Sequence, residues 1–231
     1  MNLAMIILGV VLLIVIYFMY VRFFTTPMLA KQIYLGGSPG PIDMSTLTNP
    51  SSVRCSYCFW VYASSLSSSP GGGSNNLFKI QQTSDKNSNT YLSVDITNSA
   101  NLQVQPTLSD DSKPSITLMN NFPMQTWKFV AISFDNKTLD VYLDGKIVRS
   151  IVMANNIKPP AATVGSSVVG SINWGNGDIY ISNFQRFPSP MDPMTAWSIY
   201  INGNGGSGIS SYGMEVALSK NNNITNKYTI F

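Results

Sequence analysis

Trp127–Val152 contains three short apolar runs that are separated by polar turn residues. The runs cover Phe129–Phe134, Leu139–Leu143 and Ile147–Val152, and they are rich in the β-branched and aromatic residues that strands favour. Asp144-Gly145 joins the second run to the third. This pair suits a two-residue type I′ turn, because both central positions need a positive φ. The pattern predicts a three-stranded antiparallel meander.

The middle run alternates between two sets of side chains, which are Leu139, Val141 and Leu143 on one face and Thr138, Asp140 and Tyr142 on the other. Successive side chains of a strand point to opposite faces of its sheet. We therefore expect the first set to be buried and the second set to stay in water.

Runs of the same kind recur at a spacing of about ten residues, bounded by Asn, Asp, Ser or Pro, and this spacing indicates an all-β sandwich. They are Gln32–Leu35, Val53–Ala63, Leu77–Gln81, Tyr91–Ile96, Leu102–Gln105, Ile116–Met119, Ala162–Val164, Ser167–Val169, Asp178–Phe187, Tyr212–Leu218 and Tyr228–Phe231. The last two are expected to close the sandwich. Asp192 followed by proline predicts the start of a short helix within Pro188–Tyr200.

Leu3–Phe24 is apolar almost without interruption until Arg22. At a rise of ~1.5 Å per residue, a helix of this length can cross a hydrocarbon core of ~30 Å. A cleaved signal peptide is the alternative, but it normally has a basic start and a shorter apolar stretch. We therefore expect a transmembrane anchor in residues 1–24, with its bilayer contacts made by Leu3, Ile6, Val10, Leu13, Ile16, Tyr17 and Tyr20.

The flanking charges predict how this anchor is oriented. Arg22 and Lys31 follow the apolar stretch, whereas only the α-amine precedes it, and positive charge favours the cytoplasmic side. We therefore expect a single-pass protein whose C-terminal domain lies on the cytoplasmic side. Residues 25–50 are rich in Gly, Pro, Ser and Thr and predict a tether, which leaves residues 51–231 for the sandwich and its closing strands.

Composition argues against several functions. Only 11% of the residues are charged and the formal net charge is +3, without a basic cluster, so we expect no nucleic-acid partner. The chain has no histidine, which removes His-dependent nucleophile systems and the commonest transition-metal ligand. Glu215 is the only glutamate, and a hydrolase would have to use two aspartates within ~5 to 9.5 Å. We expect a non-enzyme with no catalytic residues and no cofactor.

Two further motifs are compatible with metal binding but favour simpler readings. Cys55 and Cys58 lie three residues apart in a predicted strand and so point to opposite faces, which favours two packed thiols over a disulfide or a metal site. Asp110-Asp111 offers loop carboxylates that calcium can use. A solvated turn is the commoner arrangement, and we expect no metal.

A loop tryptophan gives the one candidate ligand site. Trp174 lies between Asn173 and Asn176 in a Gly-rich turn, and an exposed aromatic ring beside amides can stack on the face of a sugar. The alternative is a tryptophan that folds back over the edge of the sandwich, which is the commoner arrangement. Trp174, Asn173 and Asn176 are therefore the candidate ligand-binding residues, and glycans are possible partners.

Several of these segments resemble the laminin-G-like branch of the concanavalin A-like lectin/glucanase superfamily. Trp127–Phe134 resembles its W-x-h-V-A-h-S/T-h strand, Val141–Lys146 its h-Y-h-D-G-K hairpin, and Cys58–Tyr62 its S-F-W-V-Y strand, with cysteine in place of the usual serine. Gly177–Tyr200 is similar to the family's ending. The resemblance implies a two-sheet antiparallel jelly roll. Its glucan-hydrolysing members carry paired glutamates on one strand, which this sequence lacks.

An anchor followed by such a sandwich also resembles virion proteins of large double-stranded DNA viruses. That resemblance implies a non-catalytic structural protein, a viral minor capsid protein that links the internal membrane to the capsid shell. Its partners would be the lipid bilayer and capsid proteins, and the sandwich would lie between membrane and shell. The alternative function is a glycan-binding module displayed on a membrane.

Overall fold

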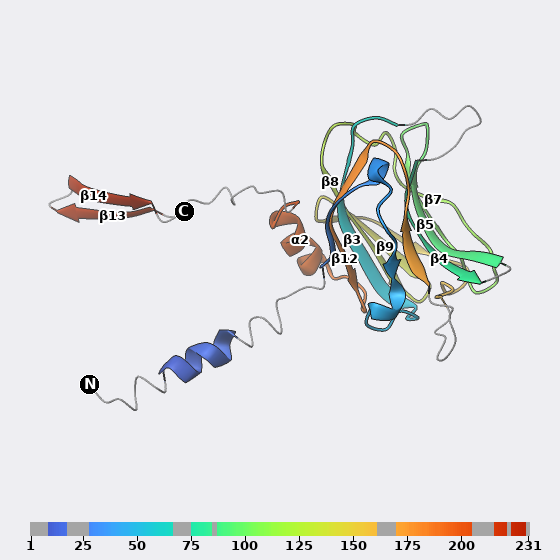
Figure 1. Ribbon diagram of the computed structural model, residues 1–231, viewed down its shortest axis with the longest axis horizontal. Coiled ribbons are helices and arrows are strands. Elements are labelled where there is room, and N and C mark those ends of the chain that lie inside the picture. Colours follow the sequence, from blue (N-terminus) through green and yellow to red (C-terminus); the bar gives the residue numbers. More distant parts are fainter. Residues whose placement is uncertain are drawn as a thin grey trace.

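Two six-stranded antiparallel sheets lie face to face in the computed structural model, which describes residues 9–17, 28–66, 75–84, 87–160, 170–204, 215–220 and 223–229 (Figure 1). Sheet A contains, in spatial order, β1 (Met28–Tyr34), β12 (Ile179–Phe187), β3 (Arg54–Ala63), β8 (Lys128–Asp135), β9 (Thr138–Leu143) and β10 (Lys146–Val152). Sheet B contains β2 (Ile42–Asp43), β11 (Ser171–Trp174), β4 (Asn75–Ser84), β5 (Asn87–Ile96), β6 (Leu102–Pro106) and β7 (Ile116–Met119). The predicted all-β sandwich of two antiparallel, jelly-roll-like sheets is confirmed.

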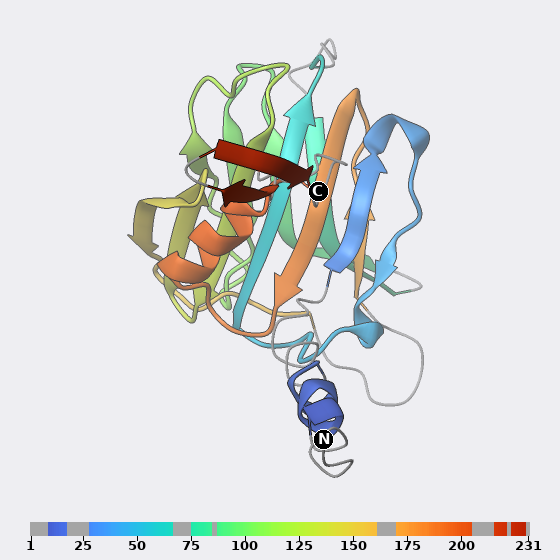
Figure 2. The ribbon, with the colours of Figure 1, turned by 90° about the vertical axis from the view of Figure 1, so that its left-hand side faces the viewer.

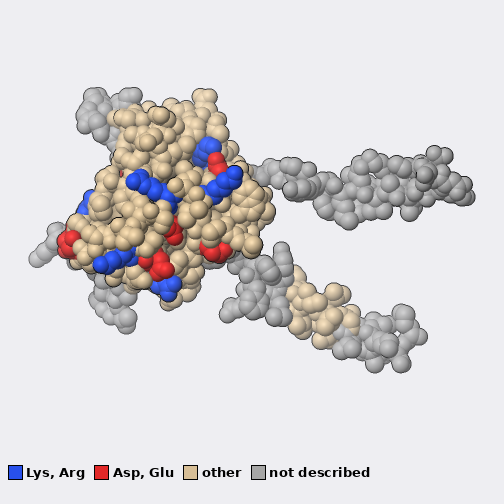
Figure 3. Space-filling view, turned by 180° about the vertical axis from the view of Figure 1, so that it is seen from behind, with Lys and Arg blue, Asp and Glu red and all other residues tan. Residues whose placement is uncertain are grey.

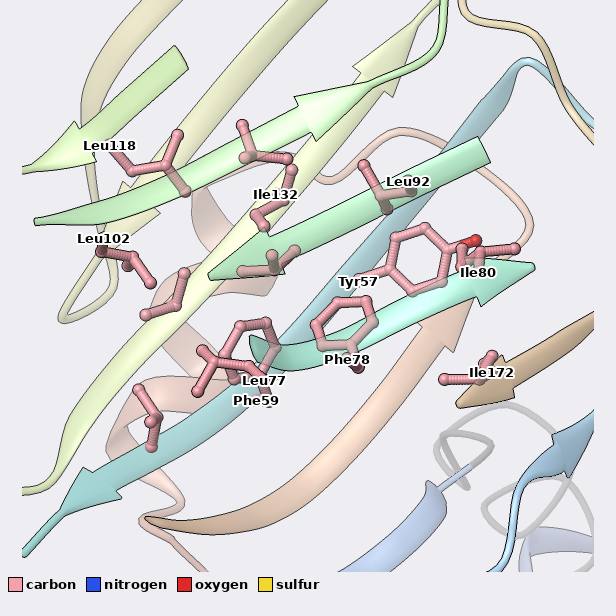
Figure 4. Close-up of a cluster of buried hydrophobic side chains, with 14 of the residues drawn as sticks. Tyr57, Phe59, Leu77, Phe78, Ile80, Leu92, Leu102, Leu118, Ile132 and Ile172 are labelled. Carbon is pink, nitrogen blue, oxygen red and sulfur yellow. The ribbon is translucent and has the colours of Figure 1, made fainter. Parts of the chain in front are cut away.

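The meander is formed by β8, β9 and β10, which pair in sequence order. Asp144 and Gly145 both have a positive φ, of 49° and 77°, as the type I′ turn requires. β3 lies between β12 and β8 near the middle of sheet A, as its aromatic density suggests. The hydrophobic core fills the space between the sheets, and Figure 4 shows side chains from both sheets meeting there, among them Phe59 and Phe78.

The outer face of sheet A is covered in part by α2 (Pro193–Ile201) (Figure 2). Asp192 caps this helix through hydrogen bonds from the main-chain N–H groups of Met194 and Thr195. A second apolar cluster forms beneath α2, and it includes Trp60 and Phe129. The sandwich therefore buries apolar side chains on both faces of sheet A.

The prediction that Tyr142 of β9 stays in water is wrong. Its side chain is 1% exposed, because α2 and the segment before it cover that part of the sheet. The Tyr142 hydroxyl donates a hydrogen bond to the Met191 carbonyl at 2.9 Å. Leu139 and Val141 point into the core between the sheets, as predicted.

The predicted tether is largely built into the sandwich. β1 forms an edge of sheet A, and β2 forms an edge of sheet B. The short 3-10 helices η1 (Leu35–Gly37) and η2 (Met44–Thr46) each bury one apolar side chain. Composition missed this because edge strands and short turns tolerate the Gly and Pro residues that this segment contains.

Arg186 of β12 ties the end of this segment to the sandwich. Its guanidinium donates to the carbonyls of Thr48 and Asn49 at 2.7 and 2.8 Å, and its Nε donates to the Tyr57 hydroxyl. The Arg186 side chain is buried, and these hydrogen bonds replace the water that its charged group would otherwise contact.

The C-terminal strands occupy a sheet of their own. β13 (Glu215–Lys220) and β14 (Asn223–Thr229) pair with each other and extend neither sheet A nor sheet B. They replace the expected closing strands Tyr212–Leu218 and Tyr228–Phe231. The two strands are neighbours in the chain, so they can pair with each other as a local hairpin without contacting the sandwich. The strands expected at Ala162–Val164 and Ser167–Val169 lie outside the described residues.

Residues 9–17 form a helix whose apolar side chains are exposed, including Val10, Leu13, Ile16 and Tyr17 of the predicted anchor. Leu3, Ile6 and Tyr20 lie outside the described residues. In the described part of the chain, no helix has both the length and the apolar character needed to span a membrane.

Candidate functional site

A hollow of about 340 Å³ lies on the outer face of sheet B, where β11 pairs with β4. It brings together the three predicted ligand-binding residues, Asn173, Trp174 and Asn176. Its other lining residues are Asn76, Lys79, Gln81 and Gly175, none of which the sequence pointed to. We refer to this set of residues as the β4–β11 hollow.

Strand alternation explains which side chains line the hollow. Asn173 pairs with Lys79, so both point outward, whereas Trp174 pairs with Phe78. The Trp174 ring packs against Phe184 and Phe78, with ring centroids 5.0 and 6.4 Å away. Trp174 is therefore half-buried, with its ring packed at the edge of the core. These ring contacts match the alternative in which the tryptophan folds back over the edge of the sandwich, while Trp174 still belongs to the lining of the hollow.

Gly175 permits the close approach of the loop after β11 to β4. Its N–H donates to the Leu77 carbonyl at 3.0 Å. A Cβ at this position would lie 1.6 Å from the main-chain oxygen of Asn76, which no side chain can tolerate. Glycine at 175 is thus what lets Asn176 lie beside Asn76 at one end of the hollow.

Amide and hydroxyl side chains form connected hydrogen bonds across this part of sheet B. Asn173 Nδ2 donates to Ser171 Oγ at 2.9 Å, and Gln81 Nε2 donates to Thr90 Oγ1 at 3.1 Å. Asn76 Nδ2 donates to Asp95 Oδ1 at 2.8 Å. These bonds fix the orientation of the amides before any ligand arrives, which lowers the entropic cost of binding.

The chemistry of the hollow suits binding better than catalysis. Lys79 supplies a cation and the amides supply both donors and acceptors, which are the groups that recognise a hydroxyl-rich ligand. The carboxylate in this network, Asp95, is occupied by Asn76 and by the Ser93 hydroxyl. The lining residues include no carboxylate and no imidazole, the side chains that most often act as general acid or base.

The two cysteines lie on opposite faces of β3, as predicted. Cys55 belongs to the core between the sheets and Cys58 to the cluster beneath α2. Both are free thiols, and burial raises the pKa of each. Elevated thiol pKa values disfavour the nucleophilic thiolate, so these cysteines act as packing residues.

Asp110 and Asp111 form a hydrogen-bonded turn. Asp110 accepts hydrogen bonds from the hydroxyl and N–H of Ser112, and these bonds hold its pKa below the ordinary value. Asp111 forms an ion pair with Lys158 at 2.5 Å. Within the described ranges, no group of three or more potential metal ligands comes together.

Acidic and basic side chains are mixed over the surface that Figure 3 shows. Arg54 pairs with Asp135 at 2.9 Å and Lys128 with Asp144 at 2.7 Å. A face with interspersed signs of charge gives no stripe of positive potential for a phosphate backbone to follow.

A family model described as the concanavalin A-like lectin/glucanases superfamily, Laminin_G_3, matches residues 37–199. No curated protein matches the chain.

Three solved structures illustrate the likeness of fold. A mutant of HCR/D is 13% identical with a TM-score of 0.50, over 67% of this chain and 38% of that one. The botulinum neurotoxin serotype D binding domain is 15% identical with a TM-score of 0.46, over 67% and 37% of the two chains. Domain 4 of AbnA, a GH43 extracellular arabinanase from Geobacillus stearothermophilus in complex with arabinotriose, is 17% identical with a TM-score of 0.45, over 69% and 70%.

The chain thus spans little more than a third of the HCR/D and neurotoxin chains that it matches. At these identities the likeness concerns the fold alone. The family match is broader, since it runs from the 3-10 helix after β1 to α2 and covers well over half of the 231 residues. The chain belongs to the concanavalin A-like lectin/glucanases superfamily.

Proposed function

We propose that this protein is a non-catalytic, glycan-binding module held at a membrane by the apolar segment Leu3–Phe24. The observation that carries the proposal is the β4–β11 hollow, in which oriented amides, one lysine and Trp174 line a single concave site. This composition matches what a sugar presents, namely hydroxyl groups around an apolar ring face. Membership of a superfamily that includes lectins supports the same reading.

The test is a glycan array probed with the detergent-solubilised full chain and with two variants of the hollow, Lys79→Ala and Asn173→Ala. Each variant removes an outward-facing polar group, and each lost hydrogen bond is expected to weaken binding by about tenfold, at ~1.4 kcal/mol. Gln105→Ala is the matched control, because Gln105 is exposed on the outer face of β6, outside the hollow.

Trp174→Ala should also abolish binding, but it removes core contacts to Phe184 as well. It is therefore interpreted only alongside a melting curve. Absence of binding across a broad array by the folded wild-type chain would refute the proposal. Equal losses in the Lys79 and Gln105 variants would show that the ligand binds elsewhere.

Orientation decides which glycans the module can reach. Arg22 and Lys31 predict that the sandwich lies on the cytoplasmic side. Protease added outside intact membranes should then spare the sandwich. Digestion of the sandwich would instead place the binding site outside the cell.

A second candidate is a structural role, that of a minor capsid protein between an internal membrane and a capsid shell. The observation that favours a protein partner is β10, an edge strand of sheet A with three exposed apolar side chains, Ile147, Val148 and Val152. Exposed edge strands accept a further strand from another chain. Mass spectrometry of purified virus particles tests this role, and finding the protein only in host membranes would remove it.

A further inference from the structure

Helix α2 is apolar on two opposite sides. Ala196 and Ile199 point into the cluster on sheet A, where they are buried. Met194, Trp197 and Ile201 lie on the other side of the helix and are 78%, 44% and 59% exposed, although the Trp197 ring also contacts Tyr200 and lies beside Gly145. Their spacing of three and four residues places them on one stripe of the helix. We refer to these three residues as the outer stripe of α2.

An apolar stripe of this kind normally has an occupant, because helices that are apolar on both sides are usually covered on both. The fold shows what lies nearby. Met28, the first residue of β1, lines the same groove of about 600 Å³ as Met194, Thr195 and Ser198 of α2. The groove therefore runs from the start of β1, past β12, to the side of α2 on which Met194 of the outer stripe lies.

Chain length then limits how far this groove can be from the bilayer. The predicted anchor ends at Phe24, four residues before Met28. Four residues reach at most ~14 Å when fully extended. Met28, where the groove begins, must therefore lie within ~14 Å of the end of the anchor, which is about twice the thickness of one headgroup layer.

We infer that the outer stripe of α2 lies in the interfacial layer of the bilayer, so that α2 acts as a second membrane contact beside the anchor. Tryptophan is enriched at this depth because its ring is apolar while its N–H remains polar. Asp192 at the start of α2 keeps that end of the helix at headgroup level, since a carboxylate with hydrogen bonds to Thr195 stays charged. The inference rests on the proposed membrane anchor.

The test measures the surroundings of a nitroxide label at the stripe, in the full chain reconstituted into phosphatidylcholine vesicles. Met194→Cys and Ile201→Cys supply labelling sites at exposed positions where substitution disturbs no buried contact. Gln105→Cys is the matched control on the opposite outer face of the sandwich. The native Cys55 and Cys58 are buried with raised pKa values, so they do not compete for the label.

Collisions with oxygen, which concentrates in lipid, are compared with collisions with a water-soluble nickel chelate. The ratio of oxygen to nickel collisions is expected to be severalfold higher at positions 194 and 201 than at 105. Nickel-accessible labels at 194 and 201, in protein that floats with the vesicles, would overturn the inference while leaving the anchor intact. Labels shielded from both reagents would also overturn it, because a protein surface would then cover the stripe. Protein that fails to float would refute the anchor itself.

Discussion

Val141→Asp tests the orientation of β9, on which the core of the sandwich depends. Val141 is fully buried between the sheets, opposite Ile132 of β8 and Arg149 of β10. The substitution replaces an apolar side chain with a carboxyl group at a position without water. We expect it to unfold the sandwich near neutral pH.

The structure sets the size of this effect. Loss of the buried valine costs roughly 1.5–3 kcal/mol. The introduced carboxyl then avoids a buried charge by taking up a proton, which costs about 1.4 kcal/mol for each pH unit above its ordinary pKa, or about 4 kcal/mol at pH 7. The total of about 6 kcal/mol is comparable to the whole stability of many domains, which is about 5–15 kcal/mol.

The cost of protonating the introduced carboxyl also determines how the destabilisation changes with pH. Burial raises the pKa of the introduced carboxyl in the folded state, so the penalty grows as pH rises above the ordinary carboxyl value. Acidification from pH 7 to pH 5 should therefore reduce the destabilisation of the variant, relative to wild type, by about 3 kcal/mol. Arg149 is the one cation opposite the new carboxylate, and its Nη1 donates to the Thr117 carbonyl at 2.7 Å. An ion pair with Arg149 would make the destabilisation depend less on pH.

The assay is urea unfolding of the detergent-solubilised full chain, followed by tryptophan fluorescence at pH 7 and pH 5. Val141→Asn is the uncharged control, and its destabilisation should not change with pH. Val148→Asp places the same charge at an exposed position and should cost little. A Val141→Asp protein with a wild-type midpoint at pH 7 would show that this side chain does not face the core.

Two further substitutions test the site and the former tether. Gly175→Ala should abolish glycan binding and cost about 1–3 kcal/mol, because its Cβ would meet the Asn76 oxygen at 1.6 Å and the loop must move; array binding and urea unfolding measure both effects. Arg186→Met should lower stability by at least about 2 kcal/mol, since three hydrogen bonds from a charged group are lost; the exposed Thr48 and Asn49 regain water, whereas the buried Tyr57 hydroxyl does not. Hydrogen exchange should rise in the segment that contains these two residues.

Matched controls separate these effects from general damage. Gly40→Ala should leave binding unchanged, because no atom lies within 4 Å of the added Cβ. Arg186→Lys keeps the charge but cannot reach both carbonyls with a planar fork, so it should recover only part of the loss. Full recovery with lysine would show that charge alone fixes the segment.

The sequence was sufficient for the parts of the fold that local pairing determines. The meander follows from three neighbouring runs and from the turn at Asp144-Gly145, and neither depends on distant parts of the chain. The opposite placement of Cys55 and Cys58 follows from strand alternation alone. These features needed no knowledge of what covers the sheets.

The sequence was insufficient wherever distant segments meet. Tyr142 looked exposed because its cover, α2, lies about fifty residues further along the chain. For the same reason, the sequence predicted only some of the residues that line the hollow. Lys79 and Gln81 belong to β4 and face Asn173 only because β11 pairs with that strand. Their alternation with apolar residues was visible, but their neighbour in the sheet was not.

The two outer faces of the sandwich give the proposals a common geometry. α2 and its outer stripe lie on the outer face of sheet A, whereas the β4–β11 hollow lies on the outer face of sheet B. The two sheets pack about 10 Å apart, so these surfaces face in opposite directions. A bilayer against α2 would therefore turn the hollow toward the solution, where a glycan can reach it. The same contact would restrict rotation of the sandwich about its anchor, so that the binding site presents a constant direction away from the membrane.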